Sequence, residues 1–321
     1  RGIEVGIIHT GQHYSTELDE IFFQDLNLPM PIAHIHVGSH QAARQIGLMI
    51  QRLEEVLREL RPDMTIVQGD TNSVLAGALT AHKMGIPVAH VEAGLRSDDW
   101  SMPEEGNRVM ADRLSDWLFC PTDLQRQRLS QEGITHAGVH VVGNTIVDAA
   151  EYYAKIAYEK SDIAERLGIT NRPYALLTMH RPGNVDNPMR LKAWMEALHS
   201  AAEALGLVLV FPIHPRTREQ LSRANIPFSS KTILGIDPVG YLDLLRLQTS
   251  AAMVLTDSGG LQEEACILRV PCVTLRPNTE RPETLHVGSN QLHNHPEKEA
   301  LMEVMKKALK KERNWSNPFG D

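Results

Sequence analysis

Short apolar segments alternate with amphipathic segments along the whole chain. Between residues 41 and 60, for example, Ile46, Ile50, Leu53 and Leu57 recur at helical spacing and share one face. We predict helices over 41–60 and about 72–84, and strands over 4–9, 64–68, 88–92, 117–120, 139–142, 175–179, 208–213, 253–256 and 270–275. The alternation predicts an α/β fold in which parallel sheets are flanked by helices.

The chain is too long for a single core of ordinary size. It has 321 residues, and domains of such proteins usually have 100 to 200 residues, roughly. Residues 148–171 become polar and helical, and this stretch ends in Gly168 and Pro173. We therefore predict two domains, residues 1–147 and 148–321.

The chemically informative residues follow predicted strands in both halves. Ligands of open α/β sheets bind beyond the carboxyl ends of the strands. A cleft between two domains would therefore bring these residues together. They are Gly69-Asp70, Glu92, His180-Arg181, His214 and Asp257-Ser258.

Residues 255–285 form a pattern of strand, glycine-containing turn, helix and strand. The turn Ser258-Gly259-Gly260 offers backbone N–H groups at a helix N-terminus, which is a natural seat for an anion. Glu263 and Glu264 lie one turn into the same helix and are placed to accept hydrogen bonds from sugar or ribose hydroxyls. Arg281 adds a fixed positive fork for a phosphate. The segment indicates a nucleotide-sugar site, although Gly-Gly after a strand also occurs as a simple tight turn.

Composition and charge exclude several classes of function. Hydrophobic residues make up 42% and charged residues 22% of the chain, which is typical of a soluble globular protein. The net charge of −8 argues against nucleic acid or an anionic membrane as the main partner. Three cysteines without C-x-x-C spacing suggest reduced thiols in a cytoplasmic protein.

A metal site is not expected, although several histidines lie close together in the sequence. His34, His36 and His40 are near one another, but no cysteine or acidic residue completes a ligand set. We expect neither a metal nor any other cofactor.

The motif DSGGLQEEA, followed by TERPETL, closely resembles the UDP-binding segment of the non-hydrolysing UDP-N-acetylglucosamine 2-epimerases. The likeness extends along nearly the whole chain. It implies the glycosyltransferase-B architecture, which is two Rossmann-like domains whose parallel sheets face a central cleft. It also implies inversion of C2 of a UDP-N-acetylhexosamine, through elimination of UDP to a glycal and re-addition. The family further suggests a homodimer.

The resemblance assigns roles to individual residues. It implies catalysis by Asp70 in QGDTNS, Glu92 in HVEAGLRS and Glu104 in MPEEGNR, and by His180 in LLTMHRPGN. It places Arg181 near phosphate. The other residues expected to bind the UDP-sugar are His214, Ser258, Gly259, Gly260, Glu264 and Arg281.

Each of the three carboxylates also has a purely structural interpretation. Asp70 precedes Thr71 and Asn72 and is suitably placed to cap a helix. Glu92 ends an apolar strand and could pair with Arg96. Glu104 follows a proline in what resembles the first turn of a helix, where acidic residues are common.

The chain departs from the family pattern in ways that bear on regulation and substrate. It has HRPGN where many members have HRREN, and Tyr14 where many have an arginine. Gln12, His13 and Glu105, which help hold a second UDP-sugar in allosterically activated members, are retained. Gly38-Ser39-His40 resembles the branch that contains epimerases for UDP-2,3-diacetamido-glucuronic acid.

The ends of the chain also differ from the family pattern. The sequence starts at what resembles the family's second strand, after a GTRPE-type loop, and stops before the usual closing helix. A sheet without its central strand exposes edges and apolar surface, so we expect poor stability and little activity of this chain.

Three other functions remain open from the residues. A glycosyltransferase of the same fold would share the UDP site but need an acceptor. A hydrolysing epimerase would release free UDP. A UDP-sugar sensor would bind without turnover.

Overall fold

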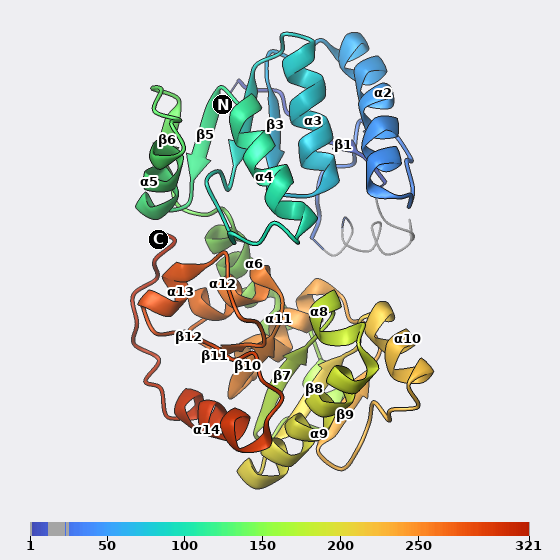
Figure 1. Ribbon diagram of the computed structural model, residues 1–321, viewed down its shortest axis with the longest axis vertical. Coiled ribbons are helices and arrows are strands. Elements are labelled where there is room, and N and C mark those ends of the chain that lie inside the picture. Colours follow the sequence, from blue (N-terminus) through green and yellow to red (C-terminus); the bar gives the residue numbers. More distant parts are fainter. Residues whose placement is uncertain (1, 12–22, 24–25, 321) are drawn as a thin grey trace. The chain divides into compact units, whose positions relative to one another are not determined.

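The computed structural model describes residues 2–11, 23 and 26–320 (Figure 1). The chain divides into two compact units. Unit 1 comprises Arg1–Asn144 with Gly320, and unit 2 comprises Thr145–Phe319 with Asp321. Among the described residues, no helix combines the length and the apolar character needed to cross a membrane.

Unit 1 contains two parallel sheets among its described residues. The smaller sheet pairs β1 with β2, and the larger sheet has the order β3-β4-β5-β6. The strands are β1 (Ile8–His9), β2 (Ala33–His34), β3 (Thr65–Gln68), β4 (Val88–Val91), β5 (Trp117–Cys120) and β6 (Val139–Val141). The helices are α2 (Ala42–Leu60), α3 (Asn72–Lys83), α4 (Pro103–Leu114) and α5 (Asp123–Gln131).

Helices α2 and α3 pack side by side in unit 1 (Figure 1). The stripe predicted from the sequence faces inward, because Met49, Leu53 and Leu57 of α2 are buried. Apolar residues before β1 and within β3 remain exposed: Ile3 is 82%, Val5 74% and Ile66 62% exposed.

Unit 2 is built on a six-stranded parallel sheet in the order β12-β11-β10-β7-β8-β9. Its strands are β7 (Tyr174–Thr178), β8 (Val208–Pro212), β9 (Ile233–Ile236), β10 (Met253–Thr256), β11 (Cys272–Thr274) and β12 (Asn290–Leu292). The chain runs outward in one direction through β7, β8 and β9, and in the other through β10, β11 and β12. The boundary between β7 and β10 is therefore the topological switch point, where open sheets of this kind bind ligands.

Helices cover both faces of the unit 2 sheet. Alternate strand residues enter two separate cores, so that Leu177 and Leu209 pack on one face and Leu176 and Val210 on the other. Burial on both faces explains why these strands are continuously apolar in the sequence. The helices are α6 (Ile146–Lys160), α7 (Ile163–Arg166), α8 (Pro182–Val185), α9 (Pro188–Leu205), α10 (Pro215–Arg223), α11 (Tyr241–Ser250), α12 (Gly259–Ile267), α13 (Pro282–His286) and α14 (Lys298–Leu309).

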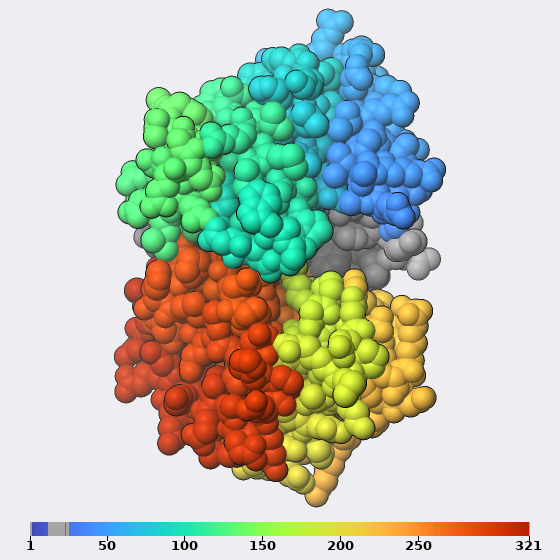
Figure 2. All heavy atoms as spheres, in the orientation of Figure 1, coloured from blue at the N-terminus to red at the C-terminus, as the bar shows by residue number. Residues whose placement is uncertain are grey.

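Distant segments of the sequence share the surface of unit 2. Figure 2 shows the yellow-green segment that contains α8 and α9 beside the orange-red final third of the chain. Hydrogen bonds from Arg190 to Asn294, and the packing of α14 against α9, join these segments.

The sequence predicted the α/β class and most strands correctly, and the differences have local causes. The predicted strand 4–9 is ordered as a strand only at Ile8–His9, where β2 supplies a partner. The predicted strand 270–275 begins two residues later, at Cys272, after Pro271, which has no N–H to donate. Strands β2, β9 and β12 were not predicted. β2 has only two residues, Gly235 interrupts β9, and Asn290 begins β12.

Candidate functional site

The carboxyl ends of β7 and β10 meet at the switch point of unit 2. Thr178 and Thr256 pair in register, and their hydroxyl oxygens lie 2.6 Å apart. The residues that follow each strand are therefore neighbours: His180 and Arg181 after β7, and Asp257 after β10. Both segments follow strands that the sequence predicted.

Asp257 joins these two segments. Its carboxylate is fully buried and accepts hydrogen bonds from the backbone N–H of His180 (3.0 Å) and of Arg181 (2.9 Å), and from Nδ2 of Asn184 (3.1 Å). His180 Nδ1 lies 3.1 Å from the same carboxylate. Burial by itself raises the pKa of Asp257, but the hydrogen bonds and the charge of His180 more than offset it, so the pKa lies below its ordinary value.

His214 lies beside His180, after the neighbouring strand β8. Its ring centroid is 5.4 Å from that of His180. Its Nδ1 accepts a hydrogen bond from the backbone N–H of Arg216 and so caps α10. His180 and His214, both predicted from the sequence, thus stand together at the carboxyl edge of the sheet.

The N-terminus of α12 completes this edge. Ser258 is the N-cap residue, but its side chain does not cap the helix. Gly259 is tightly enclosed, because a Cβ there would lie 2.4 Å from Oε1 of Glu280. Gly260 is exposed, and a Cβ there would meet nothing within 4 Å. The first turn of α12 therefore has open space in front of Gly260, as an anion seat requires.

The acidic residues of α12 already have partners within unit 2. Glu264 is buried and accepts a 2.9 Å hydrogen bond from the Tyr241 hydroxyl. Burial raises the pKa of Glu264 to about 7, with Tyr241 acting in the opposite direction. Arg281, which the sequence suggested for phosphate, is buried, and its Nε lies 2.7 Å from Oε1 of Glu263. That carboxylate neutralises much of its charge, so a role of Arg281 in phosphate binding stays a prediction.

In unit 1, two of the predicted carboxylates share an edge of the larger sheet. Asp70 follows β3 and Glu92 follows β4, and Gln68 pairs in register with Val91. Gln68 Nε2 donates a 3.1 Å hydrogen bond to Glu92 Oε1. Glu92 has φ = 67°, a left-handed conformation that is uncommon for a residue with a side chain. Such strain concentrates at functional sites.

Asp70 is held by residues of α4. Arg108 lies 2.5 Å from Oδ2 of Asp70 and 2.7 Å from Oε2 of Glu105. Asn107 Nδ2 donates a 2.9 Å hydrogen bond to the backbone carbonyl of Asp70. The N-cap of α3 is Thr71, so Asp70 does not occupy the capping position that its sequence context suggested.

The predicted helix start at Pro103 is correct, and its two acidic residues differ in environment. Glu104 is half-buried, whereas Glu105 is 1% exposed. Glu105 accepts hydrogen bonds from the backbone N–H groups of Ser97 and Asp98. Glu105 therefore holds in place both the loop before α4 and the side chain of Arg108. Gln12 and His13, the other residues predicted for a second UDP-sugar site, and Tyr14 lie outside the described residues.

A buried histidine in unit 1 was not predicted as part of the site. His90 Nδ1 lies 2.7 Å from Oδ1 of Asp112, and its Nε2 lies 2.9 Å from the carbonyl oxygen of Gly69. Arg96, the partner considered for Glu92, lies 2.7 Å from Asp112. His90 thus ties β4 to the turn that carries Asp70. The sequence signal that could have identified His90 is its position inside HVEAGLRS, two residues before Glu92.

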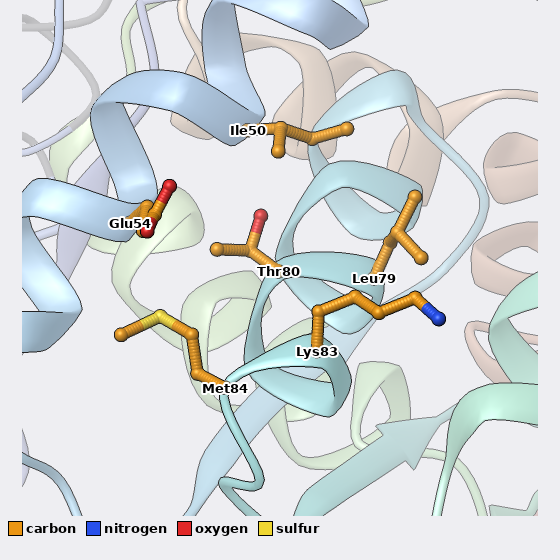
Figure 3. Close-up of a pocket in the computed structure, with 6 residues that line it drawn as sticks. All are labelled: Ile50, Glu54, Leu79, Thr80, Lys83 and Met84. Carbon is orange, nitrogen blue, oxygen red and sulfur yellow. The ribbon is translucent and has the colours of Figure 1, made fainter.

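The described residues contain no group of histidine, cysteine and acidic side chains that could hold a metal ion. A cavity of about 270 Å³ opens between α2 and α3. Figure 3 shows its lining: Ile50, Glu54, Leu79, Thr80, Lys83 and Met84. Thr80 lies eight residues after the start of α3 at Asn72, about 12 Å along the helix, so this cavity is remote from Asp70.

Comparison with known proteins identifies the chain. Its two Rossmann-like units belong to the glycosyltransferase-B fold class, as do the solved structures that it matches. A family model described as UDP-N-acetylglucosamine 2-epimerase matches residues 1–321, and the chain belongs to that family. The resemblance seen in the sequence is thereby confirmed.

Individual relatives are similar over most of their length. The UDP-N-acetylglucosamine 2-epimerase of Methanocaldococcus jannaschii is 49% identical over 99% of this chain and 88% of its own. A crystal structure of that organism's enzyme in complex with UDP-GlcNAc and UDP has a TM-score of 0.93, covering 100% of this chain and 89% of the other. The UDP-2,3-diacetamido-2,3-dideoxy-D-glucuronate 2-epimerase of Pseudomonas aeruginosa is 41% identical over 89% of this chain and 79% of its own.

Proposed function

We propose that this chain converts UDP-GlcNAc to UDP-ManNAc by inverting C2 of the sugar. The observation that carries the proposal is the switch point of unit 2, where His180, Asp257 and the open N-terminus of α12 meet. In a member of this epimerase family, such an anion seat is suited to the diphosphate of UDP.

The chemistry requires UDP to leave and return. The C2 proton has no adjacent carbonyl, so its removal alone is too costly. A base takes this proton while the C1–O bond breaks, and the electron pair of that bond goes to the diphosphate oxygen. The product is 2-acetamidoglucal. Re-addition of UDP at C1, with protonation of C2 on the opposite face, gives the epimer.

Unit 1 supplies the acid/base groups in this proposal. Asp70, Glu92 and Glu104 are the candidates for removing and returning the C2 proton. Arg108 fixes the carboxylate of Asp70, and Gln68 that of Glu92. Asp70 thus has a buried partner and Glu92 an exposed one, and each carboxylate is held separately through the two proton transfers.

Unit 2 supplies the UDP site. Ser258, Gly259 and Gly260 receive the diphosphate at the α12 N-terminus, with Arg181 and His214 beside it. Glu264 accepts hydrogen bonds from the ribose hydroxyls. His180 stabilises the departing diphosphate. UDP stays bound while the glycal is present, so UDP is not released to solvent.

The test is proton NMR of UDP-GlcNAc in D₂O with the purified chain. We expect UDP-ManNAc signals to grow with deuterium at C2, at the low rate that the sequence leads us to expect. Asp70→Asn and Glu92→Gln should lower the rate by at least about 100-fold, since each removes an acid/base group. Glu55→Gln, on the exposed face of α2, is the matched control and should retain the wild-type rate. UDP binding without exchange of the C2 proton would contradict the proposal.

The same experiment separates other outcomes. Free UDP accumulating with the epimerised sugar would indicate a hydrolysing enzyme. Transfer of the sugar only when an acceptor is added would indicate a glycosyltransferase.

A second candidate substrate is UDP-2,3-diacetamido-2,3-dideoxy-D-glucuronate. It is supported by the 41% identical relative of that name and by Gly38-Ser39-His40. Comparison of kcat/KM for the two UDP-sugars decides between them, because the preferred substrate has the larger value.

We further propose that the chain works as a cytoplasmic homodimer. Cys120, Cys266 and Cys272 are all free and buried, which suits a reducing compartment. The dimer is an expectation from the family, and light scattering coupled to size exclusion tests it: a mass near 36 kDa, the mass of one chain, would contradict it.

A further inference from the structure

Asp257 is more than an anchor for the turn after β10. Its carboxylate is fully buried and its pKa is lowered, so it remains a charged acceptor. Three of its partners are N–H groups of the segment after β7: two from the backbone of His180 and Arg181 and one from Asn184. The fourth partner, the imidazole of His180, is the only one of these groups able to change its protonation.

The geometry of the ring then determines which nitrogen is available to a ligand. Because Nδ1 of His180 lies 3.1 Å from a carboxylate that can only accept, Nδ1 carries the proton of the neutral ring. Nε2 is on the opposite side of the imidazole, and the side chain is 34% exposed. Asp257 directly precedes Ser258, so the residue that orients the imidazole of His180 also lies immediately before the anion seat of α12.

We propose that Asp257 is a positioning residue that holds His180 as the Nδ1–H tautomer and directs Nε2 to the diphosphate of the UDP-sugar. The inference rests on the proposed function. Protonation of such a ring adds its second proton at Nε2. That N–H donates to the diphosphate oxygen that receives the C1–O electron pair, and it stabilises the leaving group without transferring the proton.

The first test observes the tautomer itself in the wild-type protein. Long-range ¹H–¹⁵N correlation spectra distinguish Nδ1–H from Nε2–H rings, and His180→Gln assigns the signal among the 15 histidines. We expect His180 to be the Nδ1–H tautomer at a pH where its ring is neutral. An Nε2–H tautomer overturns the proposal. This measurement needs no turnover, so it stands even if UDP-GlcNAc is not the substrate.

The second test removes the charge but keeps a side chain of the same shape. Asp257→Asn should shift the tautomer equilibrium toward Nε2–H and lower kcat about 100-fold, with KM changed by less than about threefold. Thr178→Val is the matched control, because it removes the hydroxyl contact to Thr256 at the same strand edge without touching His180. It should leave the tautomer as in wild type.

A purely structural role predicts a different pattern. If Asp257 only anchors the turn, Asp257→Asn lowers stability and UDP affinity but leaves the tautomer of His180 unchanged. That result, or an altered tautomer with unchanged kcat, overturns the proposal. If Asp257→Asn does not fold, the wild-type spectrum alone decides. Absence of wild-type turnover with an Nδ1–H ring would reject the proposed function and leave the assigned geometry intact.

Discussion

The guanidinium of Arg108 lies 2.5 Å from the carboxylate of Asp70 and thereby fixes the orientation of this candidate acid/base group. The Arg108 side chain is 3% exposed, whereas that of Asp70 is 30% exposed. The same guanidinium lies 2.7 Å from buried Glu105. A buried cation between two carboxylates therefore determines the direction of the more accessible one.

Replacement of Arg108 should be severe because it leaves Glu105 buried without its cation. We expect Arg108→Ala to lower the free energy of unfolding by about 3 kcal/mol, as is typical when one partner of a buried ion pair is removed. Its epimerase kcat should fall as well, because Asp70 loses its fixed orientation. Urea denaturation gives the stability, and the NMR assay gives the rate.

Arg58→Ala is the control for the Arg108 variant. Arg58 pairs with Glu54 on the same helix, and its side chain is 68% exposed. Exposed pairs of this kind contribute less than about 1 kcal/mol. Equal losses of stability in both variants would show that Arg108 has no special structural role.

The buried pair of His90 and Asp112 should make stability depend on pH. Burial opposes the charged ring, but the hydrogen bond and charge of Asp112 raise the pKa of His90 above 6.5. A pKa that is raised on folding stabilises the fold fully below the unfolded value of 6.5, and this contribution is lost as pH rises through the folded value. In His90→Asn this loss of stability with rising pH should be absent.

The measurement is urea denaturation of wild type and His90→Asn between pH 6 and 9. The advantage of wild type over the variant should be largest at the acid end and shrink as pH rises. His82→Asn, at an exposed position of α3, serves as the control and should follow wild type throughout. A difference between wild type and His90→Asn that grows with pH would contradict the assignment.

The sequence was sufficient to predict residues that lie at the ends of strands. Asp70, Glu92, His180 and Asp257 all follow predicted strands, and pairing of those strands makes Asp70 and Glu92 neighbours in unit 1, and His180 and Asp257 neighbours in unit 2. The positions of the strands follow from their apolar composition, whereas their order in the sheet, which makes β7 and β10 neighbours, does not.

The partners of these residues could not be predicted, because they depend on packing between distant elements. Arg108 occurs in the interior of a polar helix, where a sequence pattern suggests solvent exposure, yet it is buried against Asp70. Tyr241 belongs to α11 and meets Glu264 of α12 only through the fold. Arg281 was predicted from its charge to bind phosphate, whereas the fold pairs it with Glu263.

Glu264 should couple UDP binding to proton release. Burial raises its pKa from 4.5 to about 7. In the free protein its contribution to stability is therefore fully present below pH 4.5 and is lost as pH rises to about 7. Ribose hydroxyls donating to this carboxylate favour its ionised form. Calorimetry of UDP binding near pH 6.5, in buffers of different ionisation enthalpy, should therefore reveal release of protons.

Glu264→Gln tests the source of those protons. The variant should bind UDP without releasing protons. Because the amide does not ionise, its free energy of unfolding should rise relative to that of wild type by about 3 kcal/mol between pH 4.5 and 8. Glu299→Gln, exposed on α14, should retain the wild-type proton release. Equal proton release by wild type and Glu264→Gln would exclude Glu264 as the ribose ligand.

The two glycines at the start of α12 should respond to alanine in opposite ways. A Cβ at Gly259 would lie 2.4 Å from Oε1 of Glu280, which is buried and held 3.0 Å from Arg276, so the carboxylate has little room to move. Gly259→Ala should therefore cost about 1 to 3 kcal/mol of stability. At Gly260 a Cβ has open space, and alanine favours a helix by up to about 1 kcal/mol.

Stability and UDP affinity should therefore separate at Gly260. Gly260→Ala should melt at or above the wild-type temperature, yet bind UDP at least about tenfold more weakly, equivalent to 1.4 kcal/mol, because its methyl group enters the space proposed for the diphosphate. Thermal melts and calorimetric titration with UDP measure the two quantities. Wild-type affinity in Gly260→Ala would mean that the diphosphate does not lie against the first turn of α12, since a ligand held there by backbone N–H groups has no room for the added methyl.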